Sequence, residues 1–163
     1  MTGGATLSPD MRYRYRLWRT WDASRPRVAF VMLNPSTADA RRDDPTIRRC
    51  IGYARAWGFG GLEVVNLFAF RATDARTLHK AADPVGRAND RHIRCAIRSA
   101  GLVVLAWGAH RMARDRAAKV RPLFSRTRPR CLGLTRSGAP RHPLYLRRDV
   151  PLVRVRSGRR SAA

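Results

Sequence analysis

Residues 28–39 read V-A-F-V-M-L-N-P-S-T-A-D, and this stretch limits what the chain can fold into more than any other. Its apolar run from Val28 ends on a polar side chain, Asn34, and Pro35 follows at once. Proline can neither donate a ladder hydrogen bond nor easily continue a helix. A continuous apolar run that ends in this way is typical of a strand buried on both faces of a parallel sheet. Ligands of such sheets bind beyond the carboxyl ends of the strands, where we expect Asn34.

Further apolar runs predict strands, and the basic segments between them predict helices. The predicted strands after residues 28–34 cover residues 62–70, 102–106 and 130–134. Helices are expected to begin at Asp44-Pro45 and at Asn89, each an N-cap residue type, and a third is expected over about 109–119. Strands that alternate with helices favour βαβ units. We therefore expect an α/β fold with three α/β/α layers and a central, mostly parallel four-stranded sheet.

The segment 11–21 is expected to add an N-terminal edge strand to this sheet. Arg12, Arg14 and Arg16 alternate with Tyr13 and Tyr15, which is the period-2 pattern of a half-buried strand. The pattern predicts that the arginines point outward, either toward phosphates or simply into solvent.

The charge of the chain is strongly positive, with 34 basic against 11 acidic residues and a formal net charge of +23. Such an excess indicates a polyanionic partner, of which nucleic acid is the first choice and DNA the specific expectation. We expect one domain over 11–155, between a flexible N-terminus, 1–10, and a flexible basic tail, 156–163. No apolar run approaches the ~20 residues that span a bilayer, and a signal-peptide core is absent. A cytoplasmic monomer without membrane contact is expected.

The three cysteines, Cys50, Cys95 and Cys131, are odd in number and far apart. They lack the paired spacing of a zinc or iron–sulfur site, so reduced and mostly buried thiols are expected. The sequence therefore predicts no metal site and no other cofactor.

Four short motifs occur in order along the chain: M-L-N-P-S at 32–36, V-V-N-L-F-A-F-R-A-T at 64–73, V-V-L-A-W-G-A-H at 103–110 and R-H-P-L at 141–144. Over about residues 11–150 the chain resembles the bacterial family 1643 of domains of unknown function, which carries Leu-Asn-Pro-Ser-Thr-Ala. The series of motifs also resembles the uracil-DNA glycosylase superfamily. Members of that superfamily have Gly-x-(Asn/Asp)-Pro after the first strand, an Asn on a second strand, a Leu-x-Trp-Gly strand and a late His-Pro-Ser.

The glycosylase resemblance implies a uracil-DNA glycosylase-like fold and hydrolysis of the N-glycosidic bond of a flipped-out base. Asn34 would hold the attacking water, and His142 would donate a hydrogen bond to the departing base. Asp39 is our choice for an assisting carboxylate, with Asp43 and Asp44 as alternatives. The base-binding candidates are Met32, Pro35, Asn66, Phe68 and Phe70. The DNA-contacting candidates are Ser36, Thr37, Arg71, Arg136, Arg141, Leu144 and Tyr145, of which the last two are candidates for a wedge that fills the gap left by the flipped base.

Two departures from the superfamily pattern bear on the substrate. Met32 stands where glycosylases usually have glycine, and Leu144 stands where they have serine. We therefore expect a damaged or modified base, including a bulky modified pyrimidine, and a role in repair or in defence against phages. Two alternatives remain open. One is a nucleic-acid-binding module with this fold and no catalysis, since Asn34 is not a carboxylate; the other hydrolyses free nucleosides or nucleotides.

Overall fold

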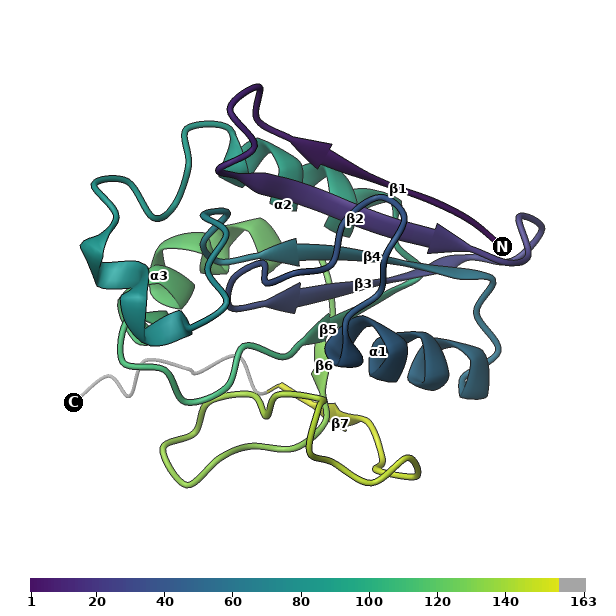
Figure 1. Cartoon of the computed structure of the whole chain (residues 1–163). Coiled ribbons are helices and arrows are strands. Elements are labelled where there is room, and N and C mark those ends of the chain that lie inside the picture. Colours follow the sequence, from purple (N-terminus) through teal and green to yellow (C-terminus); the bar gives the residue numbers. More distant parts are fainter. Residues whose placement is uncertain (156–163) are drawn as a thin grey trace.

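Seven strands of the described chain form one mixed sheet in the order β1-β2-β4-β3-β5-β6-β7 (Figure 1). The computed structural model describes residues 1–155, so the expected basic tail, 156–163, lies outside the described residues. Strands β4, β3, β5 and β6 are mutually parallel, whereas β1, β2 and β7 join the sheet antiparallel. The strands are β1 Thr2–Leu7, β2 Arg14–Thr20, β3 Arg27–Met32, β4 Gly61–Asn66, β5 Leu102–Leu105, β6 Arg130–Cys131 and β7 Val153–Arg154. The predicted parallel four-stranded centre is therefore confirmed.

Helices cover both faces of the sheet. They are α1 Pro45–Ala56, α2 Asn89–Ser99 and α3 Ala113–Val120, with two short 3-10 helices, η1 Ala75–Lys80 and η2 Arg121–Phe124. Apolar residues of α1 pack with one set of strand side chains, and those of α2 and α3 pack with the other set. In Figure 1, α1 accordingly lies apart from α2 and α3 across the sheet. This is the expected three-layer α/β/α arrangement, and within residues 1–155 each helix is too short or too polar to cross a bilayer.

The N-terminus differs from the prediction. Residues 1–10 were expected to be flexible, but Thr2–Leu7 pair with β2 from Thr2 opposite Thr20 onward. Strand β1 therefore forms the edge of the sheet, and the segment 11–21 lies one place inside it. Gly3 and Gly4 make this pairing possible, because a Cβ at either position would collide with the side chains of Arg19 or Trp18.

Of the three arginines that the alternation predicted to point outward, Arg12 is exposed, Arg16 is half-buried and Arg14 is buried. Arg14 and Arg19 are only 3% and 4% exposed, and Arg16 forms an ion pair with the buried Glu63. The loop after β3 covers this part of the strand, since Arg14 Nη1 donates to Ala38 O and Arg19 Nη2 donates to the carbonyl of the next residue. An alternating pattern identifies two faces but cannot say that a distant loop will bury the polar one.

One predicted helix cap is confirmed and one is wrong. Asp44 is the N-cap of α1, with its side chain accepting from the Ile47 N–H, and Pro45 is the first helical residue. The N-cap of α2 is Ala88, without a side-chain bond. The Asn89 amide instead donates to Asn66 O and Leu67 O, at 2.9 and 3.0 Å, and so fixes the end of β4 to α2.

Candidate functional site

A pocket of about 380 Å³ opens at the carboxyl ends of β3 and β4. Met32 ends β3, Asn66 ends β4, and the two residues are opposite each other in the parallel register. The wall is completed by residues that follow β3 and β4, by the start of α1, by the loop at 142–144, and by Arg14 of β2 and Val64 of β4. The volume lies in the range of small-molecule sites, and the position is the one that parallel sheets favour for ligands.

Much of the predicted site meets in this pocket. The expected site residues that line it are Met32, Asn34, Ser36, Thr37, Asn66, His142 and Leu144. They come from three parts of the chain that are far apart in sequence. The sequence-based expectation that one edge of the sheet gathers these side chains agrees with this geometry.

Three residues expected to bind the base lie elsewhere. Phe68 is 3% exposed and belongs to the core on the α2 and α3 side of the sheet. Phe70 packs edge-on against Tyr13, with ring centroids 5.7 Å apart, and the Arg12 guanidinium lies over it. Pro35 is buried outside the pocket wall. Neither phenylalanine is therefore positioned to stack on a base in this pocket.

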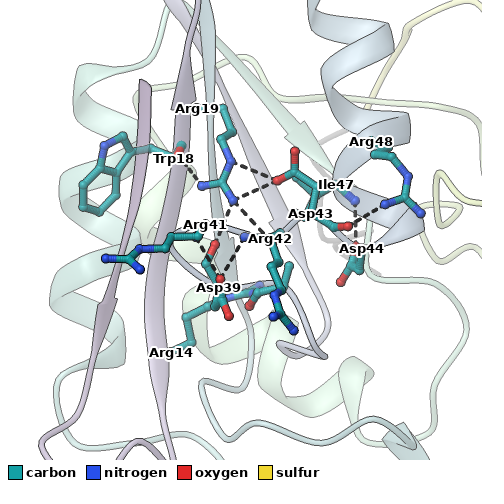
Figure 2. A network of polar contacts seen from close by, with 11 residues as sticks. Arg14, Trp18, Arg19, Asp39, Arg41, Arg42, Asp43, Asp44, Ile47 and Arg48 are labelled. Carbon is teal, nitrogen blue, oxygen red and sulfur yellow. Dashed lines mark hydrogen bonds and ion pairs between the residues drawn. The ribbon is translucent and has the colours of Figure 1, made fainter. Parts of the chain in front are cut away.

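The carboxylate at the pocket is Asp44 rather than Asp39. Oδ1 of Asp39 accepts the N–H groups of Arg41 and Arg42, both at 2.8 Å, and these bonds lower its pKa (Figure 2). This carboxylate organises its own loop and does not line the pocket. Asp44 lines the pocket while its Oδ1 accepts the Ile47 N–H at 2.8 Å. Capping uses one oxygen of Asp44, so the other oxygen remains available to a ligand.

Asn34 is held so that its amide oxygen is left available. Its Nδ2 donates to Pro35 O at 3.0 Å and to Ala72 O at 2.8 Å. Both amide protons are therefore used by the backbone, and the side chain presents Oδ1 as an acceptor. An oriented acceptor of this kind can position a water molecule.

His142 is set up as a neutral hydrogen-bond donor. Its Nδ1 accepts the Leu144 N–H at 3.3 Å, so this nitrogen carries no proton and Nε2 does. Burial lowers the pKa of His142, and the charge of Asp44 opposes this shift. The imidazole is accordingly uncharged at neutral pH and offers Nε2–H as its donor.

Two buried donors in the pocket wall lack partners among the described residues. They are Nε of Arg14 and Nδ2 of Asn66, whose side chains are 3% and 1% exposed. Buried polar groups in proteins are nearly always hydrogen-bonded, so these two donors in one pocket call for an acceptor, either a water molecule or a ligand. Sequence reasoning missed Arg14 because the alternation of β2 placed it outside. No local signal marks it, since its burial depends on the loop after β3.

A second cavity, of about 640 Å³, adjoins the pocket and shares Pro45 and Leu144 with it. Three arginines, Arg48, Arg49 and Arg148, line this cavity, which we call the arginine groove. Tyr145 follows Leu144 of the groove in sequence and is 90% exposed. Among the other expected DNA contacts, Arg136 and Arg141 are exposed, whereas Arg71 is half-buried and donates to Met11 O at 3.3 Å.

Comparison with known proteins gives a family. Residues 14–144 match the model of the family described as "Protein of unknown function (DUF1643)". The chain belongs to this family. No curated protein and no solved structure matches it. The matched residues run from β2 to the loop that carries His142, so the whole pocket wall lies within the DUF1643 domain.

Within residues 1–155, no three His, Cys, Asp or Glu side chains of this DUF1643 protein are close enough to hold a metal ion. Cys50 and Cys131 are buried, Cys95 is exposed, and all three are free thiols. The pocket wall also carries the hydroxyl groups of Ser36, Thr37, Thr46 and Thr73, beside the amides, the imidazole, the guanidinium and the carboxylate described above.

Proposed function

We propose that this protein is a DNA N-glycosylase, which hydrolyses the bond between a flipped-out base and its sugar. The observation that carries the proposal is the convergence of Asn34, Asn66 and His142 on one pocket at the carboxyl edge of the sheet. The order of the four sequence motifs, which resembles that of the uracil-DNA glycosylase superfamily, supports the same function.

The chemistry of the proposed reaction matches the groups in the pocket. The oxygen of water bonds to the anomeric carbon, the carbon–nitrogen bond breaks, and its electron pair leaves with the base. Asn34 Oδ1 accepts a hydrogen bond from that water, and the Asp44 carboxylate stabilises the positive charge on the sugar and receives the water proton. His142 Nε2–H donates to the base as it gains negative charge, and such preorganised donors are a large source of catalysis.

The surroundings of the pocket suit a nucleic acid. The arginine groove adjoins the pocket, and arginines bind phosphates with two-donor geometry. Tyr145 is almost fully exposed on the segment that carries His142, as a side chain that enters a base stack must be. We assign Tyr145, with Leu144 behind it, the role of a wedge in the flipped duplex.

Met32 bears on which base is taken. It lines the pocket at the position where glycosylases usually have glycine. We therefore propose a damaged or modified base, including a bulky pyrimidine of the kind found in phage DNA, in preference to plain uracil. A role in repair or in defence against phages would follow from that choice.

The proposal is tested with duplexes that differ at one base: uracil, hypoxanthine, hydroxymethylcytosine or glucosylated hydroxymethylcytosine. Excision is read as strand cleavage in alkali. Asn34→Ala and His142→Ala should each lower the excision rate by at least tenfold and leave the DNA affinity unchanged. Loss of one donor at a developing charge typically costs about 10²–10³-fold in rate. Asp39→Asn, which changes a carboxylate outside the pocket, is the matched control and should keep the wild-type rate.

Three other outcomes would change the proposed substrate or the proposed function. Excision of uracil alone would contradict the preference for a modified base. Tight DNA binding without excision of any base would favour a binding module. Release of bases from free nucleotides but not from DNA would favour a nucleotide hydrolase.

A further inference from the structure

Four charged residues of the described chain are buried, and three of them form ion pairs. Arg19 pairs with Asp43, Glu63 with Arg16, and Arg116 with Asp90. Arg14 is as buried as these residues but forms no ion pair within 4.0 Å. A buried charge without an ion pair is costly, so Arg14 calls for a role that offsets this cost.

Arg14 and Arg19 provide an internal comparison, since both belong to β2 and both are nearly inaccessible. The Arg19 guanidinium uses all three nitrogens: Nε with Asp43, Nη1 with Trp18 O, and Nη2 with both Asp43 and Asp39 O (Figure 2). The Arg14 guanidinium donates from Nη1 to Ala38 O at 2.6 Å. Its Nε has no partner among the described residues, and the bond from Nη1 is the one side-chain hydrogen bond that Arg14 forms there. The open edge of Arg14 is therefore Nε with Nη2, the two-donor fork that fits a carboxylate or phosphate.

Asn66 adds a third donor to the same pocket. Its side chain is 1% exposed and its Nδ2 is unpaired, while its backbone oxygen is already taken by Asn89. The pocket thus offers buried donors and, on Arg14, a positive charge without an ion pair among the described residues. Burial lowers the pKa of Arg14 to about 10, so it is still a cation at neutral pH.

We propose that the pocket binds an oxyanion, a phosphate or a carboxylate of the substrate, on the Nε–Nη2 edge of Arg14 and the amide of Asn66. This inference deepens the proposed function, on whose pocket it rests, because it names a group that the substrate must carry. A neutral carbonyl would accept the same hydrogen bonds but would leave the buried charge of Arg14 without a counterion. Asp44 fills that role only in part: its charge favours the cationic form of Arg14 and opposes the lowering of the Arg14 pKa, but Asp44 lies beyond ion-pair distance and caps α1.

The oxyanion can come from two sources, which small probes separate. Uridine 5′-monophosphate against uridine tests a phosphate on the sugar, and orotate against uracil tests a carboxylate on the base. Binding is followed by isothermal titration calorimetry at constant ionic strength set with chloride. We expect the anionic member of at least one pair to bind at least tenfold more tightly than its neutral partner. The pair that shows this preference identifies the source.

Variants separate the pocket from the general positive charge of the protein. Arg14→Lys keeps one charge but removes the two-donor edge, and should weaken binding of the preferred anion at least tenfold. Asn66→Ala should weaken it as well. Arg98→Met removes one charge from the exposed side of α2 and should leave the affinity unchanged.

Thermal unfolding without ligand gives a second readout. Arg14→Met loses the bond to Ala38 O but also removes a buried cation that has no ion pair, so it should unfold close to the wild type, whereas Arg19→Met should unfold several degrees lower. Equal affinity of anionic and neutral probes in both pairs would overturn the inference, as would undiminished binding by Arg14→Lys. Anion binding without base excision would support the oxyanion site and refute the glycosylase. Excision of neutral bases without a preference for anions would support the glycosylase and refute the oxyanion site.

Discussion

Asp44 offers the sharpest test of the proposed chemistry, because it has two roles that substitutions can separate. Its Oδ1 caps α1 at 2.8 Å from Ile47 N, and the residue also lines the pocket. Asparagine is as good an N-cap as aspartate, so Asp44→Asn removes the carboxylate and keeps the cap. Asp44→Ala removes both.

The expected magnitudes follow from these roles. Loss of an N-cap side chain costs about 1 kcal/mol, which for a domain of this size lowers the midpoint of thermal unfolding by about 2–4 °C. Loss of a group that accepts a proton or stabilises charge in the transition state lowers the rate by about 10²–10⁴-fold. We therefore expect both variants to lose activity by the same factor, and Asp44→Ala to unfold about 2–4 °C below Asp44→Asn.

The assay is single-turnover excision from the best duplex substrate, beside thermal unfolding followed by circular dichroism. Asp39→Asn is again the control, because that carboxylate lies outside the pocket. If Asp44→Asn excises at the wild-type rate, the carboxylate takes no part in the reaction. If the rate falls only in Asp44→Ala, in step with its stability, Asp44 acts through the helix cap alone.

Three further outcomes are expected. The logarithm of the DNA affinity, measured by fluorescence anisotropy, should fall linearly with the logarithm of the salt concentration, with a slope that corresponds to several phosphate contacts. Arg148→Ala should reduce that slope by about one. Burial lowers the pKa of His142 below its ordinary 6.5, so the stability that its neutral form contributes is present above pH 6.5 and is lost as the pH falls through the lowered pKa. Histidine NMR titration measures the pKa, and acid unfolding compared with His142→Asn measures the loss of stability. Asp43→Asn leaves the buried Arg19 without its carboxylate and should cost about 3 kcal/mol in urea unfolding; an unchanged midpoint would contradict that estimate.

The sequence alone predicted the features that depend on neighbouring residues. The apolar run that ends at Asn34 predicted a buried parallel strand, and Asp44-Pro45 predicted the start of α1. The βαβ order then placed Asn34 and Asn66 at one edge of the sheet, since parallel strands end on the same side. Periodicity, caps and the direction of parallel strands are all properties of local sequence, and so they can be inferred without coordinates.

The tertiary structure decided which side chains face the pocket. Phe68 and Asn66 are two residues apart, yet the first packs in the core and the second lines the pocket, because the chain leaves β4 between them. Asp44 rather than Asp39 reaches the pocket, because the loop uses Asp39 for its own turn. Arg14 is buried because the loop after β3 closes over a strand that looks half-exposed in sequence. These outcomes depend on contacts between segments far apart in the chain, and only the folded structure brings those segments together.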